Sequence, residues 1–290
     1  MENIAENYEK KGYLLQDFRI FRLKDTALAP IPFHYHDFHK IIFFLSGKAD
    51  YIIEGKTYPL RPRDLLFVSA GEIHRPRPAP GVPYERIVIY VSPDFLTHCA
   101  RSTERLDACF LLAKEHSAVM HANPGKTHDL LYHVENLDAA AHADGFANDF
   151  YTELLFLEFM ILLNRALLDH EIEENHPATY DKKILPLINY INAHLSDELP
   201  VEMLAEKFFL SKFHLMRKFK RETGYGIHQY ITNKRLLQAR NLLASDLPLT
   251  KICFDCGFKD YSTFSRAFKE FFRKSPTEYR KQKESGTKKP

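Results

Sequence analysis

Long hydrophobic runs are missing from this sequence, and cysteine is scarce. Its 290 residues contain no run of 18 uncharged apolar residues, which argues against a membrane-spanning helix. The first residues, MENIAENYEKK, lack the apolar core of a signal peptide, so we expect a cytoplasmic protein. The four cysteines suggest no disulfide framework. In CFDC at 253–256 no second cysteine or histidine pair follows, so we expect two small buried helix residues there, with zinc or redox chemistry as the alternative.

Net charge is also small, but it is unevenly distributed. The formal net charge is +2. Residues 181–290 contain 22 Lys and Arg against 12 Asp and Glu, whereas residues 1–180 contain 18 against 26. A basic C-terminal part on an acidic N-terminal part is typical of a protein that displaces counterions from phosphates. A merely solvated charged surface is the alternative.

A repeated pattern near the C-terminus predicts two helix-turn-helix units. The stretch LAEKFFLSKFHLMRKFK at 204–220 returns in altered form as ICFDCGFKDYSTFSRAFK at 252–269. A shift of 49 positions superimposes Leu215 on Phe264 and Arg217 on Arg266, and the second turn has one extra residue. In each second helix the apolar residues leave an opposite stripe polar enough to enter a DNA major groove. One such match is weak, but two copies joined by a helix are a much stronger signal.

Capping residues indicate where these helices begin. Ser211 and Asp260 suit the N-cap positions of the two recognition helices. The motif SPTE at 275–278 combines a Ser cap, a Pro at the first helical position and a Glu at the third, which predicts the start of a closing helix. Apolar residues at i, i+4, i+7 and i+11 from Ile184 predict an opening helix with one buried face.

The stretch from about Ile184 to Tyr279 resembles the AraC/XylS transcriptional regulators. The matching motifs are LA followed by LS within 204–211, FK with TG within 219–224, RLLQARNLL at 235–243, and GFKDYSTFSRAFK followed by SPTEYR. The resemblance implies two helix-turn-helix units bridged by a long helix, here 226–243, which should place the recognition helices about 34 Å apart, one turn of DNA. Cys253 and Arg273 depart from the family, which usually has Ala and Gly there.

The resemblance also implies which side chains face DNA. In the first unit they are Lys212, Phe213, His214, Met216 and Arg217, and in the second Tyr261, Ser262, Thr263, Ser265 and Arg266. An arginine can bind guanine O6 and N7 bidentately, and apolar side chains can touch thymine methyl groups. Four basic residues are better placed for phosphates: Lys212, Lys218, Lys220 and Arg221. For each arginine, a structural salt bridge or a phosphate contact is the alternative.

The first 95 residues consist of short β-rich runs, such as KIIFFL and RIVIYV, separated by turn signals. They predict an antiparallel barrel or jelly roll. HYHDFHK at 34–40 and AGEIH at 70–74 resemble the motifs of a cupin, the sensor barrel that many such regulators carry. In metal-binding cupins these motifs supply three His and a Glu. Here His34, His36 and His74 occupy the His positions, but Lys40 stands at the Glu position.

Lys40 decides between two kinds of site. An ammonium group has no lone pair for a metal and would repel a divalent cation. We therefore expect a small-ligand pocket in which His34, His36, Lys40 and His74 offer hydrogen bonds, against aromatic walls such as Phe43 or Tyr51. Two alternatives remain: a metal held by the three His, with His39 as a substitute ligand, or His residues that only satisfy one another.

Helical periodicity returns after the barrel. LDACFLLAKEHSAVM and DFYTELLFLEFMILLNRALLDH carry apolar residues at helical spacing, and the second is apolar over too much of its circumference for an ordinary surface helix. We expect a dimer helix, with packing inside the chain as the alternative. The predicted domains are a barrel (1–95), a helical dimerisation segment (96–170), a linker (171–181), a DNA-binding domain (182–283) and a basic tail (284–290).

These patterns together predict an α+β protein of two domains: an N-terminal cupin-like barrel with a helical dimerisation segment, and an all-α C-terminal domain with two helix-turn-helix units. The resemblance implies a transcriptional activator that binds double-stranded DNA and a small effector such as a sugar. It also implies a homodimer, with RNA polymerase as a further partner. We expect no enzyme activity, cofactor, metal or membrane partner. The alternatives are a cupin metalloenzyme fused to a DNA-binding domain, and a constitutive DNA binder with a vestigial barrel.

Overall fold

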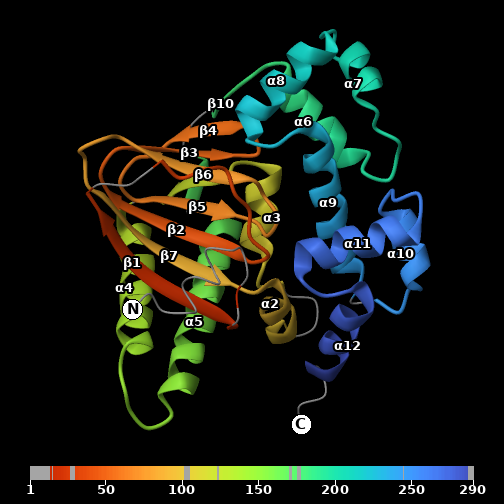
Figure 1. Cartoon of the computed structure of the whole chain (residues 1–290). Helices are drawn as coiled ribbons and strands as arrows, with labels where there is room; N and C mark the ends of the chain where they lie inside the picture. Colours follow the sequence, from red (N-terminus) through yellow and green to blue (C-terminus); the bar gives the residue numbers. More distant parts are fainter. Residues whose placement is uncertain are drawn as a thin grey trace. The chain divides into compact units, whose positions relative to one another are not determined.

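The computed structural model describes residue 14 and residues 16–26, 30–100, 105–122, 124–169, 172–174, 178–243 and 245–286. The chain divides into two compact units, residues 1–179 and 180–290. The described residues of the first unit form two antiparallel sheets and four helices, and those of the second unit are mainly helical (Figure 1). No described helix is both long enough and apolar enough to cross a membrane.

The first sheet has six strands in the order β1-β7-β2-β5-β8-β9. Their bounds are β1 Phe18–Asp25, β2 His39–Ser46, β5 Asp64–Val68, β7 Tyr84–Val91, β8 Val119–Ala122 and β9 Ile172–Glu174. The second sheet has the order β10-β4-β3-β6, with β3 Ala49–Ile53, β4 Lys56–Pro59, β6 His74–Pro78 and β10 Thr179–Tyr180.

The central strands β2, β5 and β7 of the first sheet are buried on both faces, which explains their nearly continuous apolar runs. In β2, Ile41 and Phe43 join one hydrophobic cluster, whereas Ile42 and Phe44 join another. The cluster that contains Ile42 also includes Tyr51 and other side chains of the second sheet. The cluster around Ile41 faces the helices. Because side chains alternate along a strand, each neighbouring pair serves both cores.

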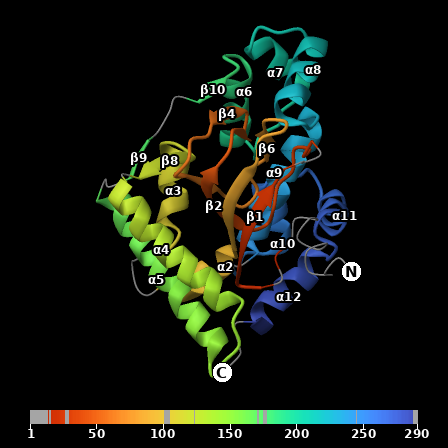
Figure 2. The ribbon, with the colours of Figure 1, turned by 90° about the vertical axis from the view of Figure 1, so that its left-hand side faces the viewer.

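Four helices cover the outer face of the six-stranded sheet: α2 Pro93–Cys99, α3 Ala108–Glu115, α4 Pro124–Ala141 and α5 Asn148–Leu168. Figures 1 and 2 show α4 and α5 as an antiparallel pair alongside this sheet. Phe156, Phe159, Met160 and Leu163 of α5 are fully buried against it. Packing inside the chain therefore accounts for one face of α5.

Two segments differ from the prediction. The pattern at 106–120 predicted helix throughout, but α3 ends at Glu115 and residues 119–122 form β8, which pairs antiparallel with β5. β9 lies within the predicted linker and pairs with β8. The physical reason is that β5 offers an open backbone edge, whose N–H and C=O groups need partners that local helical periodicity does not reveal.

The second unit contains seven described helices: α6 Ile184–Ala193, α7 Val201–Lys207, α8 Lys212–Thr223, α9 Ile227–Leu242, α10 Leu249–Asp255, α11 Tyr261–Phe272 and α12 Pro276–Gly286. Their starts follow the capping signals. Asp260 accepts a hydrogen bond from the Thr263 amide at 2.7 Å. Ser275 and Glu278 form the reciprocal bonds of a capping box, with the Ser275 amide donating to Glu278 at 2.7 Å. The predicted helix boundaries at Asp260 and Ser275 are confirmed.

Candidate nucleic-acid interface and ligand site

The first helix-turn-helix unit consists of α7, a tight turn and α8. In the turn, the Leu210 amide donates to the Ala205 carbonyl at 2.9 Å, and Ser211 has the extended backbone of an N-cap. Leu215 and Phe219 are fully buried and fix α8 against the rest of the unit. The side chains predicted to face DNA all lie on its exposed surface: Lys212, Phe213, His214, Met216 and Arg217.

Ion pairs distinguish the basic residues of α8. Lys218 Nζ lies 2.7 Å from Asp181 and is half-buried, so its charge is already neutralised and the predicted phosphate role does not fit it well. Lys212 Nζ lies 2.5 Å from Glu202, an exposed pair that DNA phosphates can replace at little cost. Arg217 is exposed and forms no ion pair with any described residue. Its guanidinium is therefore available to DNA.

The second unit repeats this arrangement with α10 and α11. Phe264 and Phe268 are fully buried, and Ser262, Thr263 and Arg266 are exposed. Tyr261 and Ser265 are half-buried, with the Tyr261 ring 5.9 Å from that of Phe264. Both recognition helices end in a left-handed residue: Gly224 after α8, and Arg273 (φ 61°) after α11, where the family usually has Gly.

The bridging helix α9 ties the two units together. Arg235 donates to the carbonyl oxygens of Leu195 at 2.8 Å and Asp197 at 2.6 Å. Gly257, in the second turn, lies so close that an added Cβ would come within 2.4 Å of the Leu195 oxygen. This turn therefore requires glycine for both its space and its left-handed backbone. The contacts hold the second turn against the loop after α6.

Cys253 and Cys256 are fully buried at the end of α10. Burial raises the pKa of the Cys256 thiol to about 12, so it stays protonated at neutral pH. Neither cysteine belongs to a cluster of potential metal ligands among the described residues. The two residues pack in the core, as the sequence predicted.

In the N-terminal unit, residues 1–179, the predicted histidines lie close together. His34, His36 and His74 have ring nitrogens within 4.8 Å of one another. Lys40 Nζ lies 3.2 Å from His36 Nε2 and 3.2 Å from His74 Nε2. His34 reaches the cluster through a backbone bridge to His74, and Lys40 projects from β2. All four residues predicted to bind ligand therefore lie together.

Backbone carbonyls fix the protonation of two histidines. Nδ1 of His34 lies 2.8 Å from the Pro32 oxygen, and Nδ1 of His74 lies 2.8 Å from the Glu72 oxygen. A carbonyl oxygen only accepts, so both Nδ1 atoms carry the proton and both Nε2 atoms keep a lone pair. A protonated Lys40 donates to Nε2 of His36, which leaves Nδ1 of His36 as an N–H donor. That nitrogen is buried without a hydrogen-bond partner among the described residues.

Burial dominates the electrostatics of this cluster. It lowers the pKa of Lys40 from 10.5 to about 7, with the nearby positive charge of Arg86 as the second cause. Burial and then the charge of Lys40 lower the pKa of His34 to about 4 and hold the pKa of His36 and His74 well below 6.5. The histidines are therefore neutral hydrogen-bond acceptors at physiological pH.

The sequence also suggested Tyr51 and Phe43 as aromatic walls of the site and His39 as a substitute ligand. The strand face on which each residue lies decides whether it reaches the cluster. Tyr51 stacks on His74, with ring centroids 6.0 Å apart. Phe43 was wrongly predicted as a wall, because it faces α5 and lies 5.9 Å from the Phe159 ring. His39 is no substitute ligand, because its Nδ1 accepts from the Ala70 amide and its ring stacks on Phe110 at 4.1 Å. On β2 both are odd-numbered and point away from Lys40.

Sequence reasoning missed two members of the site. Tyr90 presents its ring 5.3 Å from Lys40 Nζ. Arg86 is buried, pairs with Asp25 and donates to the Tyr84 carbonyl at 3.0 Å. Both belong to β7, and Tyr90 pairs with Lys40 across the sheet. The alternation of RIVIYV could have suggested that Tyr90 shares a face with Lys40, once the register of β2 and β7 was known.

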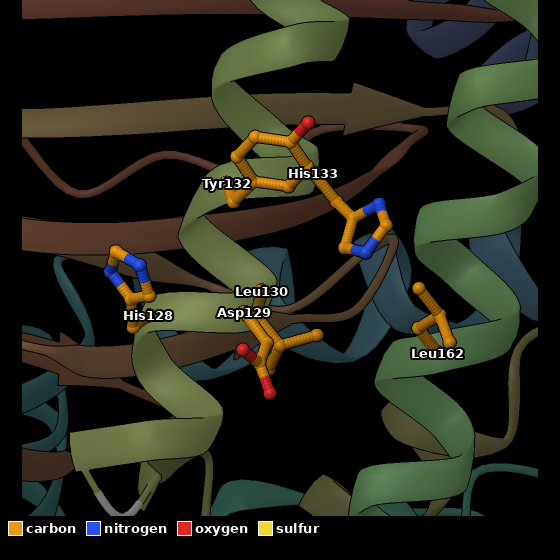
Figure 3. Close-up of a pocket in the computed structure, with 6 residues that line it drawn as sticks. All are labelled: His128, Asp129, Leu130, Tyr132, His133 and Leu162. Atoms are coloured by element: carbon orange, nitrogen blue, oxygen red, sulfur yellow. The ribbon is translucent and has the colours of Figure 1, made fainter.

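A separate surface pocket of about 260 Å³ lies between α4 and α5. Figure 3 shows that α4 supplies most of its lining and α5 supplies Leu162. The lining residues are His128, Asp129, Leu130, Tyr132, His133 and Leu162. It shares no residue with the histidine cluster. His133 Nδ1 lies 3.4 Å from Glu158 at the exposed side of α5.

Comparison with known proteins gives matches to both units. A family model described as an AraC-like ligand binding domain matches residues 25–160, and one described as a helix-turn-helix domain matches residues 204–282. The HTH-type transcriptional activator RhaS of Shigella sonnei (strain Ss046) is 28% identical over 257 residues, covering 87% of this chain and 88% of that protein.

Solved structures are similar to parts or most of the chain. The C-terminal domain of AraT, a response regulator from Geobacillus stearothermophilus, is 31% identical and covers 35% of this chain and 86% of its own, with a TM-score of 0.35. An apo ToxT variant from Vibrio cholerae strain SCE256 is 14% identical and covers 91% of this chain and 97% of its own, with a TM-score of 0.39.

Proposed function

This chain belongs to the AraC family of DNA-binding transcriptional regulators, and we propose that it activates transcription in response to a small metabolite bound in its barrel. The observation that carries the proposal is the pairing of two exposed recognition helices with a buried cluster of hydrogen-bonding groups in the ligand-binding unit. We assign it a cytoplasmic, non-catalytic role in which RNA polymerase is the further partner. The relatives named as activators support the direction of the response.

DNA recognition rests on the exposed faces of α8 and α11. We propose that Arg217 and Arg266 each bind a guanine, and that Phe213 and Met216 touch thymine methyl groups. Phe213 is 83% exposed, so its ring gains little from the protein's own core. Footprinting with Arg217→Ala and Arg266→Ala tests this: each variant should lose protection in one major groove. Loss of protection across the whole site in both variants would contradict the two-groove arrangement.

The effector site rests on the polarity of the Lys40 cluster. A protonated Lys40 has three N–H donors, of which two are used by His36 and His74. The third donor and Nδ1 of His36 remain for the oxygen atoms of a ligand. Hydroxyl and carboxylate oxygens suit such donors, which favours a sugar or a related acid as the effector.

Thermal unfolding of the full chain against sugars, sugar acids, amino acids and divalent metals tests the effector site. A ligand at a hundred times its dissociation constant should stabilise the fold by about 2.7 kcal/mol. The stabilisation should disappear in His36→Ala and Lys40→Ala. Phe254→Ala, an exposed change on α10 in the other unit, is the matched control and should retain it. If the ligand still raised the melting temperature of both His36→Ala and Lys40→Ala, its binding site would have to lie elsewhere in the chain.

We further propose that α5 forms a homodimer. Its exposed positions follow spacings of three and four residues, the seam of a coiled coil: Tyr151, Leu154, Glu158, Ile161, Arg165 and Leu168. Tyr151, Leu154, Ile161 and Leu168 are each more than 40% exposed. Parallel copies would bring Glu158 against Glu158. Antiparallel copies centred between Glu158 and Arg165 would pair opposite charges twice, so charge favours a two-fold antiparallel dimer.

A further inference from the structure

The two helix-turn-helix turns have the same backbone hydrogen bonds but carry different residues at their left-handed position. In the first, the Phe209 amide donates to Glu206 and the Leu210 amide to Ala205, at 3.1 and 2.9 Å. In the second, the Gly257 amide donates to Phe254 and the Phe258 amide to Cys253, at 2.8 and 3.1 Å. Phe209 and Gly257 therefore occupy equivalent positions, and both are left-handed, with φ of 53° and 82°.

A left-handed backbone is unfavourable for phenylalanine, because its Cβ crowds the following carbonyl oxygen. Glycine and asparagine adopt this conformation at lower cost. Packing does not compensate Phe209, because its side chain is 88% exposed and it forms no ring contact with another described aromatic residue. The fold therefore gains nothing visible from a large side chain here. Strained positions of this kind cluster at binding sites.

The position of Phe209 indicates what its ring meets. It lies two residues before Ser211, the N-cap of α8, and the N-terminal residues of a recognition helix are those that approach base edges. Phe213 and Met216, 83% and 41% exposed, are further exposed apolar side chains on α8 itself. Lys212, Arg217 and Lys220 are exposed on the same helix, so α8 combines apolar side chains with the basic charge that suits DNA.

We propose that Phe209 is a further DNA-contacting residue, which places its ring against thymine methyl groups or deoxyribose at the edge of the groove entered by α8. This inference rests on the proposed role of α8 as a recognition helix. It adds a contact from the turn itself, at a position that the second unit cannot use, because a Cβ at Gly257 would collide with the Leu195 oxygen. The two units would thus read DNA with different numbers of apolar contacts.

Phe209→Asn in the full chain tests the proposal, because asparagine tolerates the left-handed backbone and removes the ring. The probe is a DNA duplex selected from a random-sequence library with the wild-type full chain. We expect about tenfold weaker binding, the order of one lost apolar side-chain contact, together with an equal or higher melting temperature. Phe254→Ala, which removes a 57% exposed ring from α10, should bind the duplex like wild type.

The outcomes separate the possible contacts. Replacing thymine by deoxyuracil in the half-site bound by α8 should weaken wild type more than Phe209→Asn if the Phe209 ring meets methyl groups. It should weaken both proteins equally, through Phe213 and Met216 alone, if the Phe209 ring meets deoxyribose. Unchanged duplex affinity of Phe209→Asn would overturn the proposal. Loss of transcription with RNA polymerase at unchanged affinity would assign the ring to a protein partner instead. Failure to select any sequence would count against DNA recognition itself, which distinguishes it from failure of the Phe209 contact.

Discussion

The N-terminal unit, residues 1–179, should become more stable as the pH rises from 7 to 8.5, and replacing Lys40 by methionine should abolish this gain. The folded-state pKa of Lys40 is lowered to about 7, whereas its ordinary value is 10.5. Between these values the unfolded chain binds a proton that the folded chain releases, so stability rises with pH. Integrated from pH 7 to 8.5, this gain is about 1.6 kcal/mol, or roughly 3–6 °C in melting temperature.

The pH window isolates Lys40 from its neighbours. The lowered pKa values of His34, His36 and His74 also make stability rise with pH, but most of that rise is complete by pH 7, because the ordinary histidine pKa is 6.5. The raised thiol pKa of Cys109 lowers stability only when the unfolded thiols ionise, near pH 9. Unfolding by urea, followed by near-ultraviolet circular dichroism, measures the effect. Parallel pH profiles for wild type and Lys40→Met would refute the reasoning.

Three other predictions concern separate parts of the molecule. Lys40→Glu restores a carboxylate beside the three histidines and should bind about one Zn²⁺ or Ni²⁺ per chain in metal analysis after dialysis; no gain over wild type would contradict the geometry. Asp260→Ala should cost about 1 kcal/mol of unfolding free energy and Ser211→Ala less, because only Asp260 forms a side-chain cap bond. In sedimentation, Glu158→Arg should weaken the proposed dimer and added Arg165→Glu should restore it; no recovery would argue against antiparallel pairing.

The helical unit could be predicted closely because its signals are local. Asp260, Ser275 and Gly224 cap helices within four residues of the groups they satisfy, so sequence spacing alone places them. The bridging helix, expected at 226–243, runs from Ile227 to Leu242. Phe209 escaped prediction because its significance depends on a backbone angle, which the repeat shows only after its turn is compared with that of Gly257.

The barrel could be predicted in kind but not in register. The resemblance to the cupin motifs placed His34, His36 and His74 together, and the structure brings their ring nitrogens within 4.8 Å of one another. A shift of one residue along β2 decides which of its side chains face the histidine cluster. The sequence did not show that Lys40 faces the cluster whereas Phe43 faces the helices. β8 was missed because its apolar residues Val119 and Met120 resemble the end of the preceding helix, and only the partner edge of β5 shows that they form a strand.

The structure changes what Lys40 means for the site. From the sequence, Lys40 replaces one ligand at the edge of a potential metal sphere. In the fold its Nζ lies 3.2 Å from two Nε2 atoms, and the Nδ1–H groups of His34 and His74 are held by backbone carbonyls, as they are in many metal sites. The ammonium group thus takes the central position itself and donates hydrogen bonds to the lone pairs that a metal cation would bind. A ligand bound there, as we propose, would meet N–H donors rather than a Lewis acid, which favours recognition of oxygen atoms over their chemical activation.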